Sequence, residues 1–351
     1  MSQWPVYTGT AAPHDHVDAL PAPPPWRAFD GGPPLEPPAG DEEAGSPDLA
    51  HRARTYQATP EAVDLVNAAL FLRRPLLVTG PPGSGKSSLA YAVARELRLG
   101  PVLRWNITSR ATLQDGLYRY DPLARLHAAR SAAVRTAAPS SEDPPDGSPD
   151  ADGDQALQDH LRLGPLGTAL LPYRRPRALL IDEIDKSDLD LPNDLLNVLE
   201  EGRYEIPELV RAARHTPRAR VMVDGDAERV TVRGGAVRCR SFPFVVLTSN
   251  GEREFPPAFL RRCVSLRLRR PDGDRLERIV RAHLGAPDDY ARGLIATFLG
   301  RSDAGELATD QLLNAIYLTG AAGLTGPSRD ALAARLMPYL GNGPGADEDE
   351  R

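Results

Sequence analysis

Residues 75–88 read PLLVTGPPGSGKSS, and this stretch decides the fold. The apolar run Leu76–Val78 predicts a strand, and the run Leu89–Leu97 predicts a helix just after a glycine-rich loop. The loop has the spacing Gly80-x-x-x-x-Gly85-Lys86-Ser87. Glycines at these places let successive backbone N–H groups point at phosphate oxygens, and the helix adds its positive dipole end. The sequence therefore predicts a phosphate-binding loop between a strand and a helix.

This loop has two kinds of expected contact. Lys86 is expected to reach the β- and γ-phosphates of a nucleotide, and the Ser87 hydroxyl to bind Mg²⁺. An ordinary glycine-rich turn between two packed elements is the alternative interpretation. The residues expected to hold the nucleotide are Gly80, Pro81, Pro82, Gly83, Ser84, Gly85, Lys86, Ser87 and Ser88.

A second motif supplies two carboxylates. The four apolar residues Ala178–Ile181 predict a buried parallel strand, and Asp182 and Glu183 follow at its end. Ligands of open α/β sheets bind in the crevice at the carboxyl ends of the strands. We expect Asp182 to act as the Mg²⁺ partner and Glu183 as the base that polarises the attacking water.

Two further sites follow in chain order. The strand predicted at Phe244–Leu247 ends near Asn250, whose amide can bridge the attacking water and the γ-phosphate. Arg261 and Arg262 come after a short predicted helix, and an arginine from outside a site commonly stabilises a transferring phosphoryl group. A solvated basic helix end is the alternative for these arginines.

Bulk properties narrow the class of protein. The net charge of −6 argues against a generic polyanion binder. No apolar run reaches the length of a membrane span, and the first residues do not have the plan of a signal peptide. The two cysteines, Cys239 and Cys263, show no metal-binding spacing and suit a reducing compartment. These features favour a cytoplasmic protein with no membrane partner.

The chain divides into four predicted regions. Residues 1–50 are rich in proline but hold the aromatic residues Trp4, Tyr7, Trp26 and Phe29, so we expect the segment to dock on its own core or on a partner through aromatic anchors; a solvated tail is the alternative. Residues 51–270 form the α/β domain, and their acidic stretch 137–157 predicts a disordered insert. Residues 271–341 predict four short helices, and 342–351 an acidic tail.

This order of elements resembles the AAA+ ATPases. Residues 181–209 (IDEIDKSDLDLPNDLLNVLEEGRYEIPEL) and the segment Gly164–Leu166 resemble the MoxR type within that class. The resemblance covers residues 55–340 approximately. It implies a three-layer α/β P-loop domain with a parallel sheet and a small all-α lid. ATP is expected over GTP, because a guanine-specific Asn-Lys-x-Asp motif is absent from the sequence.

The resemblance also implies an assembly and residue roles. A homo-oligomeric ring, usually a hexamer, would bind ATP between subunits. Arg262 would act on the neighbour's γ-phosphate with Arg261 beside it, and Asn250 would be the first sensor. Many AAA+ lids carry a second sensor arginine at the third lid helix, but that helix begins here at Ala308 without one. Two alternatives follow: Arg329 acts as the second sensor, or the chain has no second sensor.

The resemblance places two inserts at the pore of such a ring. The first candidate is residues 113–120, and the second is the arginine-rich region 203–240, with a hairpin turning at Gly225-Asp226. This region predicts a contact with an acidic protein or nucleic acid, and a solvated hairpin face is the alternative. We expect an ATP- and Mg²⁺-dependent remodeller of a partner protein, and the resemblance implies a chaperone-like role with a partner that has a von Willebrand factor A domain. A nucleic-acid motor and a slowly hydrolysing ATP switch are the alternatives.

Overall fold

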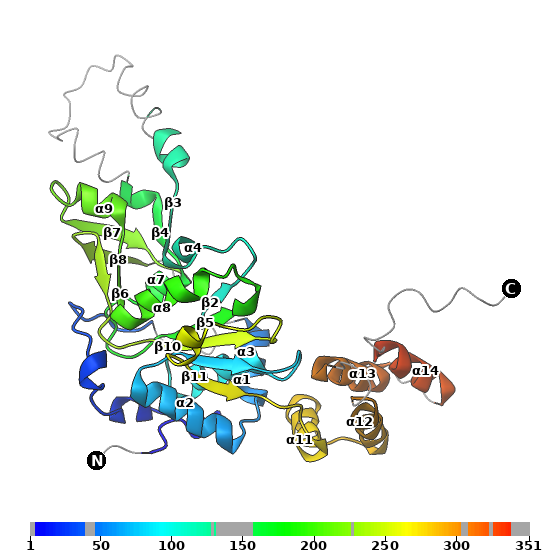
Figure 1. The fold of residues 1–351 in the computed structure, drawn as a ribbon. Helices are drawn as coiled ribbons and strands as arrows, with labels where there is room; N and C mark the ends of the chain where they lie inside the picture. The colour runs from blue at the N-terminus through cyan, green and yellow to red at the C-terminus, as the bar shows by residue number, and fades with distance from the viewer. Residues whose placement is uncertain are drawn as a thin grey trace.

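A five-stranded parallel sheet forms the centre of the molecule (Figure 1). The structure is a computed structural model that describes residues 4–38, 46–127, 130, 157–225, 228–302, 308–322 and 326–337. The sheet order is β11-β1-β10-β5-β2, and all neighbours are parallel. Its strands are β1 Leu76–Thr79, β2 Leu103–Asn106, β5 Ala178–Asp182, β10 Phe244–Ser249 and β11 Val264–Arg267. The predicted α/β class with a parallel sheet is confirmed.

Hydrophobic cores lie on both faces of this sheet. Successive strand residues face opposite sides, so Leu76 and Val78 join the core beneath α2 and α3, and Leu77 joins the core beneath α7 and α8. The Thr59 side chain caps α2 by accepting from the Ala62 N–H. The helices of this domain are α1 Pro47–Thr55, α2 Pro60–Leu72, α3 Lys86–Glu96, α4 Leu113–Leu117, α7 Pro165–Ala169, α8 Leu191–Glu201, α9 Pro207–Ala212 and α10 Pro257–Leu260. The sheet is therefore the middle of three layers.

Four helices follow the sheet and lie together at one side of it in Figure 1. They pack around their own core, which includes Leu276, Phe298 and Leu312. These helices are α11 Gly273–Leu284, α12 Asp289–Ser302, α13 Thr309–Ala321 and α14 Pro327–Leu336. The predicted lid is therefore all-helical. Within the described part of the chain, no helix is long and apolar enough to cross a membrane.

A second sheet lies beside the first and has the order β3-β4-β7-β8-β9-β6. The sequence predicted its β7–β8 hairpin but none of its other strands. The segment expected as a first insert becomes α4 and β3, and β3 pairs with β4. The strands are β3 Tyr118–Tyr120, β4 Leu161–Leu163, β6 Arg203–Glu205, β7 Arg218–Met222, β8 Arg229–Arg233 and β9 Ala236–Arg238.

Three sequence predictions fall on residues outside the described part. The expected insert 137–157 is described only at its last residue, Leu157, which is buried. The expected acidic tail 342–351 lies wholly outside the described residues. The turn predicted at Gly225-Asp226 is described only at Gly225.

The segment 4–38, which we call the arm, packs against the α/β domain. It contains two short 3-10 turns, η1 His16–Ala19 and η2 Pro25–Arg27, and one bridge from Leu35 to Tyr173. Among the expected aromatic anchors, Tyr7 is buried and Phe29 stacks on Phe242 at 5.6 Å, whereas Trp26 is 76% exposed and Trp4 is 53% exposed. Tyr7 and its neighbour Val6 anchor the beginning of the arm, because both side chains are buried in the core.

Buried polar side chains of two helices fix the beginning of the arm. Asn67 of α2 accepts from the N–H groups of Val6 and Tyr7 at 2.8 and 2.9 Å. Glu96, the last residue of α3, accepts from backbone N–H groups of Thr8 and Ala11. Buried polar groups are costly without partners. The arm's backbone N–H groups and the side-chain oxygens of Asn67 and Glu96 therefore supply one another's hydrogen-bond partners.

Candidate functional site

The predicted phosphate-binding loop lies between β1 and α3, as expected. Gly85 precedes α3 with φ 86°, a left-handed conformation that favours glycine. Gly83 has φ 71°, and a Cβ atom there would lie 2.8 Å from the backbone nitrogen of Thr309 in the lid. The loop therefore packs directly against the beginning of α13, and a side chain at position 83 would push the two apart.

A cavity of about 540 Å³ opens at this loop. Asp182 and Glu183 enter it from the end of β5, and Asn250 from the end of β10. These strands are parallel neighbours, so their carboxyl ends meet at one edge of the sheet. The structure thus brings Lys86, Ser87, Asp182, Glu183 and Asn250 together around one cavity, and the loop residues 82–88 line it.

The oxygen pair at the floor of the cavity fits Mg²⁺. The Ser87 hydroxyl donates to Asp182 Oδ1 at 2.7 Å. A hydroxyl and a carboxylate are hard oxygen donors, which Mg²⁺ prefers, and the ion fills its remaining positions with water and phosphate oxygens. Arg104 of β2 donates to the other oxygen, Asp182 Oδ2, at 3.0 Å and so orients the carboxylate.

Lys86 lies folded over the loop. Its Nζ donates to the carbonyl oxygens of Gly80 and Pro81 at 2.8 and 2.9 Å. Burial lowers the pKa of Lys86, while Asp185 and Asp182 act in the opposite direction. The ammonium is therefore held beside the place where phosphates would lie, with carbonyl oxygens as its present partners.

Glu183 has an unusual backbone conformation, with φ 61° and ψ 48°. Its N–H donates to Thr248 Oγ1 at 2.9 Å, and the same hydroxyl donates to Asp182 Oδ1 at 2.7 Å. The Glu183 carboxylate pairs with Lys186 at 2.8 Å. Left-handed backbone is costly for a residue other than glycine and persists where its surroundings hold it. Thr248 thus links the carboxylate that is expected to bind Mg²⁺ to the expected base.

Asp185 is a buried acid that the sequence analysis did not single out. Its Oδ2 accepts from the backbone N–H groups of Asn250, Gly251 and Glu252 at 2.9, 3.1 and 3.1 Å. These contacts fix the turn that carries the Asn250 side chain to the cavity. The signal was present in the sequence, because Asp185 lies two residues after Glu183 in the same acidic run.

The structure does not bring Arg261 and Arg262 to this cavity. The Arg262 guanidinium pairs with Glu200 of α8 at 2.6 Å, and Arg261 is exposed. Arg262 also lines a small hollow together with the exposed Trp26 of the arm. Both arginines therefore lie on a surface that a second copy of the chain could approach.

Arg329, the alternative second sensor, also lies away from the cavity. Its guanidinium stacks on the Tyr290 ring at 3.6 Å from the centroid and faces Asp288 at 3.7 Å. The arginines that do line the cavity are Arg275 of α11 and Arg52 of α1. Sequence reasoning missed both, since neither belongs to a recognisable motif.

A family model described as AAA domain (dynein-related subfamily) matches residues 75–263. The chain belongs to this family. The dynein-related AAA subfamily includes the MoxR-type AAA+ ATPases, so the AAA+ resemblance is confirmed.

One solved structure similar to this AAA domain is NtrX from Brucella abortus in complex with ADP. The two chains share 14% identity and a TM-score of 0.39, over 87% of this chain. This chain spans 57% of the length of that one. A search of curated protein sequences gives no match.

Proposed function

We propose that this AAA domain protein is an Mg²⁺-dependent ATPase of the MoxR type that remodels a partner protein. One observation carries the proposal: the Ser87 hydroxyl lies 2.7 Å from the Asp182 carboxylate in a cavity that Lys86 and Glu183 also line. A phosphate-binding loop, a metal-binding pair and a candidate base in one cavity are what ATP hydrolysis requires.

The residues would divide the work by position. When bound, Mg²⁺ on Ser87 and Asp182 supplies charge neutralisation at the phosphates. Lys86 would exchange its two carbonyl partners for phosphate oxygens. Glu183, fixed through its N–H by Thr248, would orient and deprotonate the attacking water, and Asn250 would hold that water from the other side. Catalysis would rest on positioning and electrostatics.

The location of Arg262 supports a site shared between subunits. Its side chain lies outside its own chain's cavity and is partly exposed. We propose a homo-oligomeric ring, hexameric by resemblance to the MoxR type, in which Arg262 contacts the neighbour's γ-phosphate and Arg261 lies beside it. The same resemblance suggests a client protein with a von Willebrand factor A domain.

A specific contact favours a second candidate, an ATP-dependent switch with slow turnover. Lys186 occupies one carboxylate oxygen of Glu183 at 2.8 Å and so competes with the water that the base must hold. If this contact restrains catalysis, Lys186→Met should raise the rate of ATP hydrolysis. If hydrolysis is the normal function, the same substitution should leave the rate within about threefold of the wild type.

The test is ATP turnover by the wild type against Glu183→Gln. We expect Glu183→Gln to lower kcat about a hundredfold or more, since general-base catalysis contributes that much. Glu205→Gln, which changes an exposed glutamate on β6, is the matched control. Equal and negligible rates for the wild type and Glu183→Gln would establish the switch instead.

The ring requires a separate test. Lys86→Ala and Arg262→Ala each remove one half of a shared site, so mixing the two proteins should restore part of the activity at mixed interfaces. Absence of rescue at every ratio, with both variants folded, would refute an arginine acting between subunits.

A further inference from the structure

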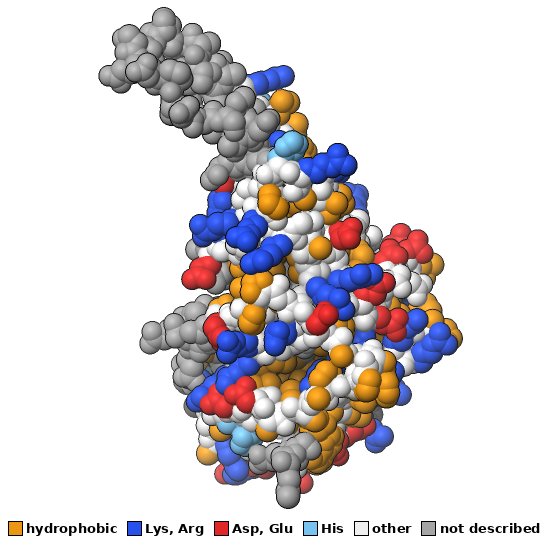
Figure 2. Space-filling model, turned by 90° about the vertical axis from the view of Figure 1, so that its left-hand side faces the viewer, with side chains coloured by type: hydrophobic (Ala, Val, Ile, Leu, Met, Phe, Trp, Pro, Cys, Tyr) orange, Lys and Arg blue, Asp and Glu red, His pale blue; other side chains and the backbone are white. Residues whose placement is uncertain are grey.

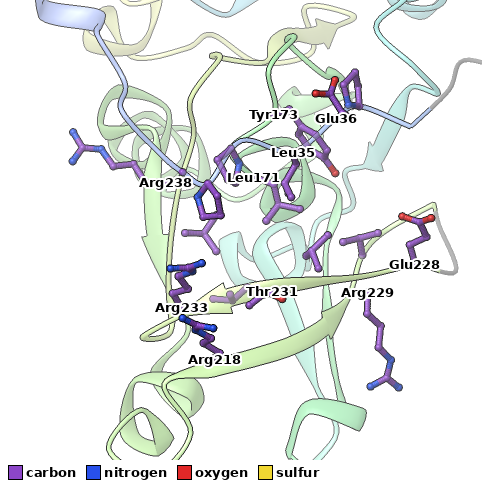
Figure 3. Close-up of a pocket in the computed structure, with 18 of the residues that line it drawn as sticks. Leu35, Glu36, Leu171, Tyr173, Arg218, Glu228, Arg229, Thr231, Arg233 and Arg238 are labelled. Carbon is purple, nitrogen blue, oxygen red and sulfur yellow. The ribbon is translucent and has the colours of Figure 1, made fainter.

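A second cavity lies outside the nucleotide site and has a volume of about 840 Å³ (Figure 3). We call it the groove. One wall is β8, another is β9, and the arm residues 32–38 form a third. Leu35, Leu171 and other aliphatic side chains give it an apolar lining. Figure 2 shows this side of the molecule, where arginine side chains stand around hydrophobic surface.

Two arginines at one end of the groove face each other across the hairpin. Arg218 of β7 lies directly opposite Arg233 of β8, and both are exposed (Figure 3). Among the described residues, no acidic side chain forms an ion pair with either. Like charges directly opposite on neighbouring strands are destabilising. An anion bound between the two guanidinium groups would remove this repulsion.

The edge of β8 that faces the groove is open. Gly234 N donates to Pro217 O, which extends the β7–β8 ladder. Because backbone groups alternate between the two sides of a strand, the N–H and C=O of Thr231 point away from β7. On that side, β9 meets β8 only at Arg233 opposite Ala236. Thr231 therefore offers a backbone donor and acceptor to the groove, as strand edges that accept peptides do.

The charges of the groove are divided between its ends. Arg218 and Arg233 lie at one end in Figure 3, together with Arg238, which pairs with Asp30 at 2.8 Å. Glu36, Glu228 and Arg229 lie at the other end, where Glu36 pairs with Arg174 and Arg229 pairs with Asp159. A nucleic-acid backbone carries a negative charge at every step and needs a continuous basic track. The two glutamates interrupt such a track, whereas an extended peptide can place its acidic residues at one end only.

We propose that the groove binds an extended acidic peptide of a partner protein, added as a strand to the edge of β8. Its backbone would pair with Thr231, its carboxylates would lie between Arg218 and Arg233, and its apolar side chains would face Leu35 and Leu171. The inference rests on the proposed function in one respect: the protein that supplies the peptide is taken to be the protein that the ATPase remodels.

Fluorescence anisotropy on the full chain without nucleotide tests the proposal. The probe is a labelled peptide of about six residues, the length of an ordinary strand, that alternates valine with polar residues and carries its aspartates in one half only. The comparison probes are the same peptide with lysine for aspartate and a labelled oligothymidylate. We expect saturable binding of the acidic peptide alone.

Two pairs of variants test the two kinds of contact. Thr231→Pro removes an outward-facing N–H, a change that edge strands tolerate, and should weaken peptide binding about tenfold; Thr231→Val keeps the N–H and should bind like the wild type. The double variant Arg218→Gln/Arg233→Gln should weaken binding about a hundredfold. Arg220→Gln, on the same face but outside the groove lining, should change it less than about threefold.

Several outcomes would overturn the proposal. These are no saturable binding, equal binding of the lysine peptide, tighter binding of the oligothymidylate, or equal losses from Arg220→Gln and the double variant. Binding that appears only after deletion of residues 137–156 would assign the groove to the chain's own acidic segment. If Thr231→Pro lowers the melting temperature, the arginine variants decide alone.

The outcomes also separate this inference from the proposed function. Peptide binding by a wild-type chain that does not hydrolyse ATP would refute the ATPase and leave the groove. ATP hydrolysis by a chain that binds no peptide would refute the groove and leave the ATPase.

Discussion

Replacing Thr248 with valine tests whether one hydroxyl holds both carboxylate residues of the site. Thr248 is 1% exposed, and valine has nearly its shape. The substitution removes the acceptor of the Glu183 N–H and one donor to the Asp182 carboxylate. An unsatisfied buried N–H costs about 1–3 kcal/mol, and a hydrogen bond to a charged group contributes about 1.5–3 kcal/mol.

The expected loss of stability follows from these two terms. The added methyl group returns about 1 kcal/mol of apolar burial, so the free energy of unfolding should fall by about 1.5–5 kcal/mol. A domain of the size of this α/β domain loses roughly 2–4 °C of Tm per kcal/mol, which gives a decrease of roughly 3–20 °C. Turnover should also fall, by about a hundredfold, because Glu183 loses the contact that fixes its left-handed backbone.

Thermal unfolding and steady-state ATP hydrolysis measure the two effects. Thr248→Ser keeps the hydroxyl and loses only a methyl group, so it should retain most of the activity and lose about 1 kcal/mol. If Thr248→Val matches Thr248→Ser in both Tm and kcat, the hydroxyl does not hold the site and the reasoning is wrong.

Three further predictions concern other parts of the chain. Burial and the neighbouring His51, 3.0 Å away, lower the pKa of His283. Because the unfolded chain then binds more protons than the folded chain, stability should fall as the pH drops below about 6.5. The pH dependence of Tm should therefore flatten in His283→Gln. Burial raises the pKa values of the Cys239 and Cys263 thiols to about 12, so Ellman's reagent should label them only as fast as the protein unfolds, and rapid labelling of the native protein would contradict this burial. The fluorescence of the exposed Trp26, beside Arg262, should shift to the blue as subunits associate; a shift that persists in Trp26→Phe would place the signal elsewhere.

The nucleotide cavity could be predicted because its signals are local. Strand, loop and helix around Gly80–Ser87 follow one another without a gap, and Asp182 comes directly after its strand. Parallel strands share one edge for their carboxyl ends, so chain order alone predicts that these residues meet. Arg104 and Arg275 could not be found in this way, since their contacts depend on how distant elements pack.

The second sheet and the arm show where sequence patterns carry too little information. Strands of three residues such as β3 and β4 give no measurable alternation, and long-range pairing decides them. In the arm, hydrophobicity favoured Trp26 as the anchor, whereas Arg27 is the buried residue and stacks on Phe242 at 4.6 Å. Its three hydrogen bonds to the carbonyls of Arg73 and Glu200 satisfy the buried guanidinium.

The arm has a mechanical consequence. Thr8 and Ala11 of the arm donate to Glu96 at the end of α3, and residues 32–38 form a wall of the groove. Between them, Arg27 donates to the carbonyl of Glu200, whose carboxylate pairs with Arg262. The arm is one continuous segment of chain, and it thus connects α3, which begins at the phosphate-binding loop, with the surface around Arg262 and with the groove. A shift of α3 on nucleotide binding would therefore displace the arm. Such a displacement would change the hydrogen-exchange rates of the backbone amides in residues 8–38.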